Sequence, residues 1–408
     1  MLTIEPALRR GGGRSKLAIA LAGGGPLGFF YELGALHALS EAIEGRDLTE
    51  FDVYVGVSSG SLIAAALASG FDTAAMCAMF FHDESMLFPF SPAILLRPAL
   101  REYARRLIRL PKMLAQIVQR YARDPGSGAW EALVGPLGRL LPTALFDNEP
   151  LQDYLRLLFN SKGHTDDFRK LRARLYVVAT NLNTGASVSF GGPGHRRVPI
   201  SRALLASSAL PGLYPAVEID GQHYVDGALI RTMHASLALE YKCNFVICIN
   251  PIVPLDASQA RAQRPINLVD EGLPAILGQT FRALIYSRMK VGMATYGARY
   301  PTADMLLLEP DRHDERLFFA NVFRYAERLS LAEHAYRRTR RDLLAQSKAL
   351  APLLERRGLR LNIAVLRDPN RSLPAARRTW HRVRQTARRL EVAVQRIERL
   401  LQAPGVAG

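Results

Sequence analysis

Short apolar runs alternate along the chain with longer stretches in which apolar residues recur at every third or fourth position. Nearly every residue in the short runs is apolar, which is typical of strands buried on both faces of a mostly parallel sheet. The runs that predict strands are Leu17–Leu21, Val53–Val57, Leu175–Thr180, Phe245–Asn250 and Met305–Leu308. Phe29–Glu44 and Leu62–Ser69 have helical periodicity. We therefore expect an α/β core, from about residue 16 to residue 310, in which helices cover a mostly parallel sheet.

Residues from about 82 to 150 interrupt this alternation of strands and helices. Eight basic residues fall between positions 97 and 123, against Glu102 as the one acid. Apolar residues recur there every three or four positions, at Leu100, Tyr103, Leu107, Leu110, Leu114, Ile117 and Tyr121. The pattern predicts a basic, amphipathic helical insert that breaks near Pro111. Its polar side is either an ordinary solvated face or a surface that meets an anionic partner.

The last hundred residues are predicted to be helical and basic. Residues 311–408 contain 22 Lys and Arg against 10 Asp and Glu, so most of the excess positive charge lies there. Pro369 and Pro374 separate a final predicted helix, at about Ala375–Leu401. We therefore divide the chain into a basic N-terminal segment (1–15), an α/β domain (16–310) with a helical insert (82–150), and a basic helical extension (311–408).

The net charge of +16 and the pI of about 10.1 favour an anionic partner, either nucleic acid or an acidic membrane surface. No stretch reaches the ~18 uninterrupted apolar residues that a membrane-spanning helix needs. The first apolar run is too short for the hydrophobic region of a signal peptide, so we expect an unexported protein. Cys77, Cys243 and Cys248 are too few for a disulfide framework and lack the paired spacing of a zinc site, which favours buried thiols.

The sequence Gly56-Val57-Ser58-Ser59-Gly60 follows a predicted strand and precedes a predicted helix. In this G-x-S-x-G pattern a sharp turn exposes the serine hydroxyl, and the flanking glycines avoid clashes with the neighbouring strand and helix. The N-terminal amides of the following helix favour a developing negative charge. We therefore predict that Ser58 is a nucleophile and that Gly56 and Gly60 form the elbow around it.

A second turn, Gly23-Gly24-Gly25-Pro26-Leu27-Gly28, follows the first predicted strand and matches the G-x-G-x-x-G fingerprint of dinucleotide-binding proteins. That class needs an acidic residue at the end of the second strand, where this chain has Ser58. Backbone amides that no side chain shields are suited to hold a tetrahedral oxyanion. We therefore predict an oxyanion hole formed by Gly23, Gly24, Gly25 and Gly28.

Two kinds of base are candidates for activating Ser58. A Ser-His-Asp enzyme needs a histidine in a late loop, and the candidates among the nine histidines are His223, His234 and His313. Asp226 instead lies in a tight turn after a short apolar strand, beside a glycine that leaves room for a close partner. An aspartate acts as a base only where desolvation or geometry favours proton transfer, and otherwise it caps its own turn.

These turns, in this order and at these intervals, resemble the patatin-like phospholipases. The blocks that carry the resemblance are Gly23–Gly28, Gly56–Gly60, Ala179–Gly185, Ala206–Pro215 and Asp226–Ala228, and they span about residues 16–250. The resemblance implies an α/β, three-layer fold and the hydrolysis of lipid acyl esters without a metal or other cofactor. It also implies a catalytic dyad, with Ser58 as nucleophile and Asp226 as its base, and no catalytic histidine.

Three positions depart from the family pattern. The family commonly has Lys or Arg at the position of Leu27, aspartate at that of Asn181 and glycine at that of Ala228. With Leu27, the chain lacks the cation that the family has near the oxyanion loop. We expect this change to alter the anchoring of the loop or the preference for a lipid head group, and therefore to affect the choice of substrate more than the dyad. The resemblance does not extend to the last hundred residues.

We therefore expect a lipid acyl hydrolase of the phospholipase A or lysophospholipase type, cytoplasmic and peripheral at the inner face of the membrane, where its basic helices contact anionic lipid. The alternatives are a thioesterase or polyester depolymerase with the same dyad, and a non-catalytic lipid-binding module. A binding module needs neither Ser58 nor Asp226. Nucleic-acid binding has only the arginine-rich tail in its favour, because no recognised motif accompanies it.

Overall fold

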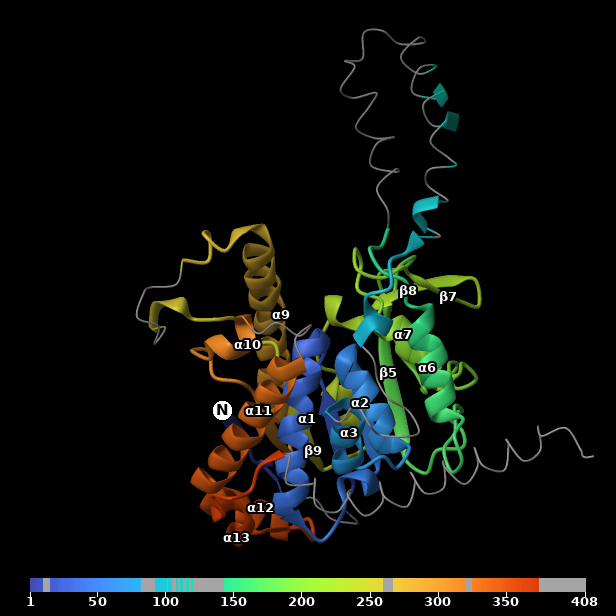
Figure 1. Cartoon of the computed structure of the whole chain (residues 1–408). Coiled ribbons are helices and arrows are strands. Elements are labelled where there is room, and N and C mark those ends of the chain that lie inside the picture. The colour runs from blue at the N-terminus through green and yellow to red at the C-terminus, as the bar shows by residue number, and fades with distance from the viewer. Residues whose placement is uncertain are drawn as a thin grey trace, which may run out of the picture.

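The computed structural model describes residues 1–9, 15–81, 92–100, 143–259, 267–319 and 325–373, with short pieces between 102 and 119 (Figure 1). The strands are β1 (Leu2–Glu5), β2 (Leu17–Leu21), β3 (Ile43–Glu44), β4 (Val53–Val57), β5 (Arg174–Asn181), β6 (Ser187–Phe190), β7 (Val217–Ile219), β8 (Gln222–Asp226), β9 (Phe245–Ile249), β10 (Asp304–Leu308) and β11 (Arg360–Leu361). The helices are α1 (Gly25–Ala42), α2 (Ser59–Ala68), α3 (Thr73–Phe81), α6 (Glu149–Phe159), α7 (Ile200–Ser207), α8 (Ala235–Glu240), α9 (Gly272–Arg299), α10 (Glu315–Phe319), α11 (Tyr325–Ala345), α12 (Ser347–Glu355) and α13 (Ile363–Arg367).

A nine-stranded sheet forms the centre of the described structure, in the order β1-β10-β9-β2-β4-β5-β8-β7, with β6 paired to β5. The neighbours from β10 to β5 run parallel, whereas β1, β6 and β8 are antiparallel to their partners. The mostly parallel α/β fold that the sequence predicts is therefore confirmed. Each of the five predicted strands is present, with bounds that differ by one residue at most.

Side chains on the two faces of the sheet belong to two separate cores, which makes the fold three-layered. Leu17, Ile19 and Leu21 of β2 face the larger core, which α1, α2, α3, α7 and α11 cover. Ala18 and Ala20 of the same strand face the smaller core, which includes residues of α8 and α9. Alternate residues of one apolar run are thus buried on opposite faces, as a central strand requires.

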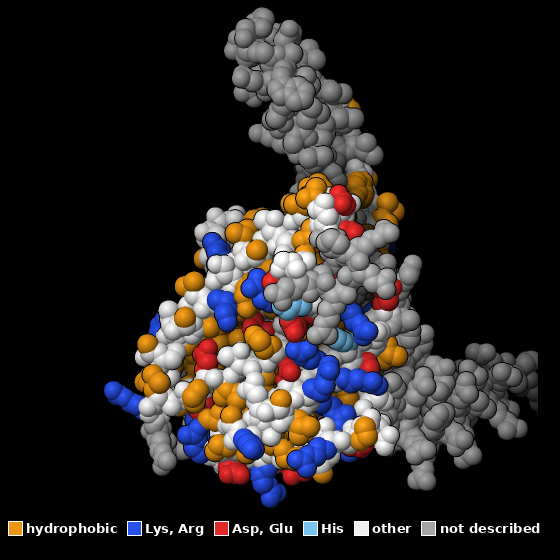
Figure 2. Space-filling view, turned by 90° about the vertical axis from the view of Figure 1, so that its left-hand side faces the viewer, with side chains coloured by type: hydrophobic (Ala, Val, Ile, Leu, Met, Phe, Trp, Pro, Cys, Tyr) orange, Lys and Arg blue, Asp and Glu red, His pale blue; other side chains and the backbone are white. Residues whose placement is uncertain are grey.

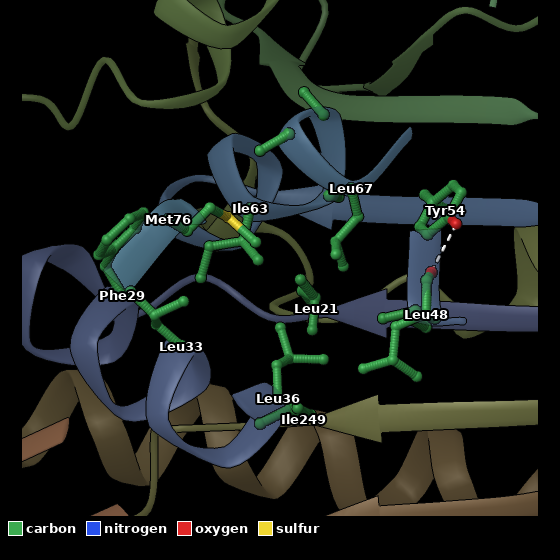
Figure 3. Close-up of a cluster of buried hydrophobic side chains, with 14 of the residues drawn as sticks. Leu21, Phe29, Leu33, Leu36, Leu48, Tyr54, Ile63, Leu67, Met76 and Ile249 are labelled. Atoms are coloured by element: carbon green, nitrogen blue, oxygen red, sulfur yellow. Dashed lines mark hydrogen bonds between the residues drawn. The ribbon is translucent and has the colours of Figure 1, made fainter. Parts of the chain in front are cut away.

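Aliphatic and aromatic side chains interlock in the larger core (Figure 3). Leu33 and Leu36 of α1 and Ile63 of α2 are fully buried around the end of β2. Tyr54 is also fully buried, and its hydroxyl donates a hydrogen bond to the carbonyl of Leu48 at 2.6 Å. This bond offsets the cost of burying a polar group and fixes β4, which leads to Ser58, beneath α2.

Both ends of the described chain join the α/β core. The predicted basic N-terminal segment contains β1, whose Leu2 pairs with Leu308 of β10. Within the predicted C-terminal extension, α11 packs against α1 so closely that a Cβ atom on Gly34 would lie 2.1 Å from the carbonyl oxygen of Ala332. An ion pair of 2.9 Å between Arg371 and Glu41 adds to this contact. The helices after residue 311 therefore complete the larger core.

Most of the predicted helical insert lies outside the described residues, as does the predicted helix Ala375–Leu401. The described base of the insert contacts the segment that precedes β7. Ala144 forms a bridge with Gly212, and the Tyr214 hydroxyl donates a hydrogen bond to the Leu95 carbonyl at 2.9 Å. Among the helices of the described residues, none has both the length and the apolarity needed to cross a membrane.

The contact between α1 and α11 gives a test of the fold. We expect Gly34→Ala to lower the free energy of unfolding by roughly 1–3 kcal/mol, because the added methyl group meets the backbone of α11. The matched control is Gly278→Ala in α9, where a Cβ atom would meet nothing within 4 Å. That change should be neutral or stabilising by up to about 1 kcal/mol. Urea denaturation measures both, and equal stabilities for the two variants would contradict the packing described.

Candidate active site

Ser58 lies at the sharp turn between β4 and α2. Its backbone has φ of 50° and ψ of −125°, a conformation that a residue other than glycine rarely adopts. A Cβ atom on Gly56 would lie 2.4 Å from Cα of Ser61, and one on Gly60 would lie 2.4 Å from the carbonyl oxygen of Ala22. The two glycines therefore let the strand, the turn and the helix approach one another at the positions that the sequence pattern suggests.

A serine on α7 holds this strained turn in place. The Ser58 amide donates a hydrogen bond of 2.9 Å to Oγ of Ser207, whose hydroxyl donates one of 2.6 Å to the carbonyl of Val178. Sequence reasoning missed this role. The available signal was that Ser207 lies inside the block Ala206–Pro215, but nothing in that block indicates which of its polar groups meets the elbow.

Asp226 ends β8 and accepts a hydrogen bond of 2.5 Å from Oγ of Ser58 through its Oδ2 atom. The register of the sheet explains this meeting, because Val57 of β4 pairs with Val178 and Asp226 pairs with the adjacent Ala179 on the same central strand, β5. Oδ1 of Asp226 accepts a second bond, of 2.8 Å, from the amide of Ala228. The Ser58 and Asp226 residues are only 6% and 3% exposed, so the pair lies in a nearly dry setting.

Burial raises the pKa of Asp226 to about 6, although the hydrogen bonds from Ser58 and Ala228 pull the pKa in the opposite direction. The carboxylate is therefore still ionised at neutral pH but binds a proton more readily than an exposed aspartate does. A group with a pKa near the working pH is suited to accept a proton and return it.

The glycine turn lies beside Ser58 at the start of α1. Gly25 has φ of +59°, and among the described residues neither its amide nor that of Gly24 has a hydrogen-bond acceptor. The first amides of a helix have no partner within the helix, which leaves these two donors available at its positive end. They lie on the same loop as Gly23, where a Cβ atom would come within 3.1 Å of Cβ of Ser58.

The other two glycines of the turn have occupied amides. Gly23 donates to the carbonyl of Thr232 at 3.1 Å, and Gly28 donates to that of Gly24 at 3.0 Å. Close packing requires glycine at both positions. A Cβ atom on Gly23 would lie 2.9 Å from Cβ of Ala228, and one on Gly28 would lie 2.9 Å from Cγ of Pro251. Of the four glycines predicted to form an oxyanion hole, Gly24 and Gly25 are thus the two whose amides have no acceptor among the described residues, whereas Gly23 and Gly28 shape the loop.

No histidine completes a triad within the part of the chain that the structure describes. His234 is buried and has no bond to Ser58 or Asp226, and burial, together with the nearby Arg231, lowers its pKa to about 4. His223 is exposed, and its backbone amide bonds to Asn183. His313 lies in the loop before α10. Ser58 is thus paired directly with a carboxylate, without an intervening imidazole.

Comparison with known proteins identifies the family of this chain. A sequence profile of one family, described as patatin-like phospholipase, matches residues 19–239, more than half of the chain. The chain belongs to the patatin-like phospholipase family. The matched residues run from β2 to α8 and include both Ser58 and Asp226.

The solved structures that match this chain include VipD and ExoU. VipD from Legionella pneumophila is 14% identical, with a TM-score of 0.35, and the match covers 82% of this chain and 70% of VipD. ExoU from the type III secretion system of Pseudomonas aeruginosa, solved in complex with SpcU, is 16% identical, with a TM-score of 0.26. That match covers 90% of this chain and 67% of the ExoU chain.

The three departures from the pattern of the patatin-like phospholipases have local structural accounts. Leu27 is half-buried and packs against the larger core, so α1 is anchored there by an apolar contact. Asn181 closes its turn by accepting hydrogen bonds from the amides of Asn183 and Thr184 at 2.9 and 3.1 Å. The amide of Ala228 donates a hydrogen bond to Asp226, and the methyl group of Ala228 has room because residue 23 is glycine.

The raised pKa of Asp226 predicts a pH-dependent cost to stability. Because the folded state binds this proton more tightly than the unfolded chain, the contribution of Asp226 is most favourable below about pH 4 and declines as the pH rises through about 6. Asp226→Asn does not titrate, so its stability relative to wild type should be greater at pH 8 than at pH 4 by about 2–3 kcal/mol.

Chemical denaturation at the two pH values measures this difference. Asp153→Asn, a change to an exposed carboxylate on α6, serves as the control and should show no comparable pH dependence. Asp226→Asn and wild type following the same pH dependence would mean that the Asp226 carboxylate is not desolvated as described.

Proposed function

We propose that this member of the patatin-like phospholipases is a serine carboxylic-ester hydrolase that removes acyl chains from lipids, of the phospholipase A or lysophospholipase type. The observation that carries the proposal is the 2.5 Å hydrogen bond from Oγ of Ser58 to Oδ2 of Asp226, in a buried turn beside two free amides. A nucleophile, a base and oxyanion donors are the minimum that acyl transfer needs.

In the proposed mechanism, Oγ of Ser58 attacks the carbonyl carbon of the ester while Asp226 takes its proton. The amides of Gly24 and Gly25 hold the oxyanion, a contribution of roughly 3–4 kcal/mol per donor where one has been removed from an enzyme. Collapse of the intermediate expels the alcohol, which receives the proton from Asp226. Water then attacks the acyl group on Ser58 with Asp226 again as the base. As the acyl bond breaks, Oγ of Ser58 takes the proton back from Asp226, and the free acid leaves.

Exposed apolar side chains around the site support a lipid substrate. Three leucines that lie before and after Asp226 in the sequence are each more than a third exposed, namely Leu210, Leu213 and Leu229. Nearby, Arg288 of α9 donates a hydrogen bond to the carbonyl of Ile230 at 3.5 Å. Further along α9, the exposed apolar residues are Leu273, Ile276, Leu277, Phe281 and Leu284. We propose that this apolar border faces the lipid surface from which the acyl chain enters.

Docking on anionic membrane through the basic helices is part of the same proposal. Arg97 and Lys112 of the insert are exposed, and the other basic residues of the insert lie outside the described residues. Cations near an anionic leaflet are each worth about 1 kcal/mol, so a few of them are enough for reversible binding. Such docking places the protein at the inner face of a membrane.

The nucleophile is tested by Ser58→Ala. We expect this variant to lose at least about a thousandfold in kcat/KM on both a short-chain p-nitrophenyl ester and phospholipid vesicles, because among the described residues no other hydroxyl bonds to the carboxylate of Asp226. Ser59→Ala is the matched control from the same turn, since its hydroxyl has no hydrogen-bond partner in the described structure. It should stay within about tenfold of wild type. Full hydrolysis by folded Ser58→Ala would remove the serine from the mechanism, and inactivity of wild type on every acyl ester would favour a binding module.

The base is tested by the pH dependence of the reaction. Only ionised Asp226 accepts the serine proton, so kcat/KM of wild type should rise with pH through about 6 and then level off. Asp226→Asn should lose about as much activity as Ser58→Ala, because members of one catalytic unit give similar losses. Alanine variants of His223, His234 and His313 should each stay within about tenfold of wild type. A folded histidine variant as inactive as Ser58→Ala would point to a triad instead.

A further inference from the structure

A cavity of about 640 Å³ lies among the helices that follow the α/β domain, outside the site described above. Its walls come from α10, α11, α13 and the residues up to 371. Six arginines line it, namely Arg316, Arg337, Arg340, Arg341, Arg367 and Arg371, against the two carboxylates of Glu333 and Asp368. Figure 2 shows Lys and Arg side chains gathered on this side of the molecule. The excess of cations distinguishes the cavity from the apolar border of the acyl-hydrolase site.

Arg340 forms a buried and fixed part of the wall. It is 7% exposed, and its charged end lies over the ring of Tyr336. Its guanidinium group donates to four backbone carbonyls, those of Val365, Leu366, Asp368 and Arg371. No carboxylate pairs with it among the described residues, and its Nε atom has no hydrogen-bond partner there. The carbonyls offset part of the cost of burying this cation but supply no counter-charge, which a bound anion would add.

Three further guanidinium groups around the cavity are free. Arg316, Arg341 and Arg367 are exposed, and no ion pair joins them to a carboxylate within the described part of the chain. The two acids of the lining are already engaged. Glu333 pairs with Arg337 and also accepts a hydrogen bond from the amide of Leu373 at 2.7 Å, and Asp368 lies 3.5 Å from Arg371. The cavity therefore offers several unused donors and a net positive charge.

We propose that this cavity binds a small anion that carries two or more phosphate groups. The planar fork of arginine matches the oxygens of phosphate in a bidentate manner, and several such forks around one cavity favour clustered negative charge over a single carboxylate. A lipid head group and a soluble polyphosphate share this chemistry. The cavity is partly open to solvent, and its volume suits a small molecule, whereas an extended nucleic acid is bound along a longer groove or surface.

The cavity and the dyad are separate sites, because the lining of the cavity includes neither Ser58 nor Asp226 nor any residue of the glycine turn. Arg371 of the lining pairs with Glu41 near the C-terminal end of α1, whereas the glycine turn beside Ser58 leads into the N-terminal end. An 18-residue helix is about 27 Å long, so Arg371 lies far from the glycine turn. The proposal therefore does not depend on the acyl-hydrolase activity, and its test measures binding alone.

Titration calorimetry of the full-length protein with sodium tripolyphosphate tests the proposal. Wild type should bind, and binding should weaken as NaCl is raised. Arg341→Gln/Arg367→Gln removes two free cations from the cavity and should weaken binding by roughly tenfold or more, because charged hydrogen bonds are lost. The control, Arg156→Gln/Arg360→Gln, removes the same charge from exposed positions outside the lining and should stay within about twofold of wild type. Thermal melting of both variants checks that the fold is intact.

Vesicles distinguish the two sources of phosphate. Phosphatidylinositol bisphosphate in phosphatidylcholine vesicles carries two phosphate monoesters on one lipid head group, and phosphatidylserine at equal charge is the control lipid. Loss of binding to phosphatidylinositol bisphosphate in Arg341→Gln/Arg367→Gln, with binding to phosphatidylserine unchanged, assigns the cavity to a lipid head group, and loss for tripolyphosphate alone assigns it to a soluble anion. Absence of binding to either probe, equal losses in the two double variants, or tighter binding of duplex DNA that the cavity variant leaves unchanged would overturn the proposal.

Discussion

The direct hydrogen bond between Ser58 and Asp226 is the contact on which the rest of this structure depends. The two residues are 168 positions apart, and they lie 2.5 Å from each other, as the proposed direct proton transfer from Ser58 to Asp226 requires. β5 provides this precision, because β4 and β8 meet end to end on one edge of it, at the adjacent residues Val178 and Ala179, while β6 pairs with the other edge. Ser207 then fixes the backbone of the turn by linking the Ser58 amide to the same strand.

Burial makes the same contact chemically useful. A carboxylate in water is a poor base because it releases its proton at low pH, whereas desolvation raises the pKa of Asp226 to about 6. Ionisation of this buried carboxylate lowers the free energy of unfolding of the protein. The large core around the central strands offsets that loss, and α11 contributes to this core where it approaches α1 closely at Gly34. The described helices after residue 311 thus support the site, although none of their described residues belongs to it.

The sequence predicted the elements whose signal is local. Continuous apolar runs gave the central strands, and the pattern Gly56–Gly60 gave the elbow because close packing there excludes a Cβ atom. β1 was not predicted, because its four residues are too few to show a periodicity and the strand is stabilised by its pairing with β10.

In the candidate site, contacts between residues far apart in the sequence could not be predicted either. Sequence placed four glycines in the oxyanion hole, but only the fold shows that the Gly23 amide is occupied by Thr232 and that of Gly28 by Gly24. From the sequence, the arginines of α11 and α13 indicate only that the C-terminal region is positively charged. That they line one cavity could not be predicted, because this depends on how α13 packs against α11.

Covalent labelling followed by peptide mapping tests the central claim most directly. A fluorophosphonate reacts with a serine only where a base and an oxyanion hole activate it. The account predicts one adduct per chain, on the peptide that contains Ser58, with labelling abolished in Ser58→Ala and strongly slowed in Asp226→Asn. An adduct on another serine, or labelling at the wild-type rate in Asp226→Asn, would contradict the dyad.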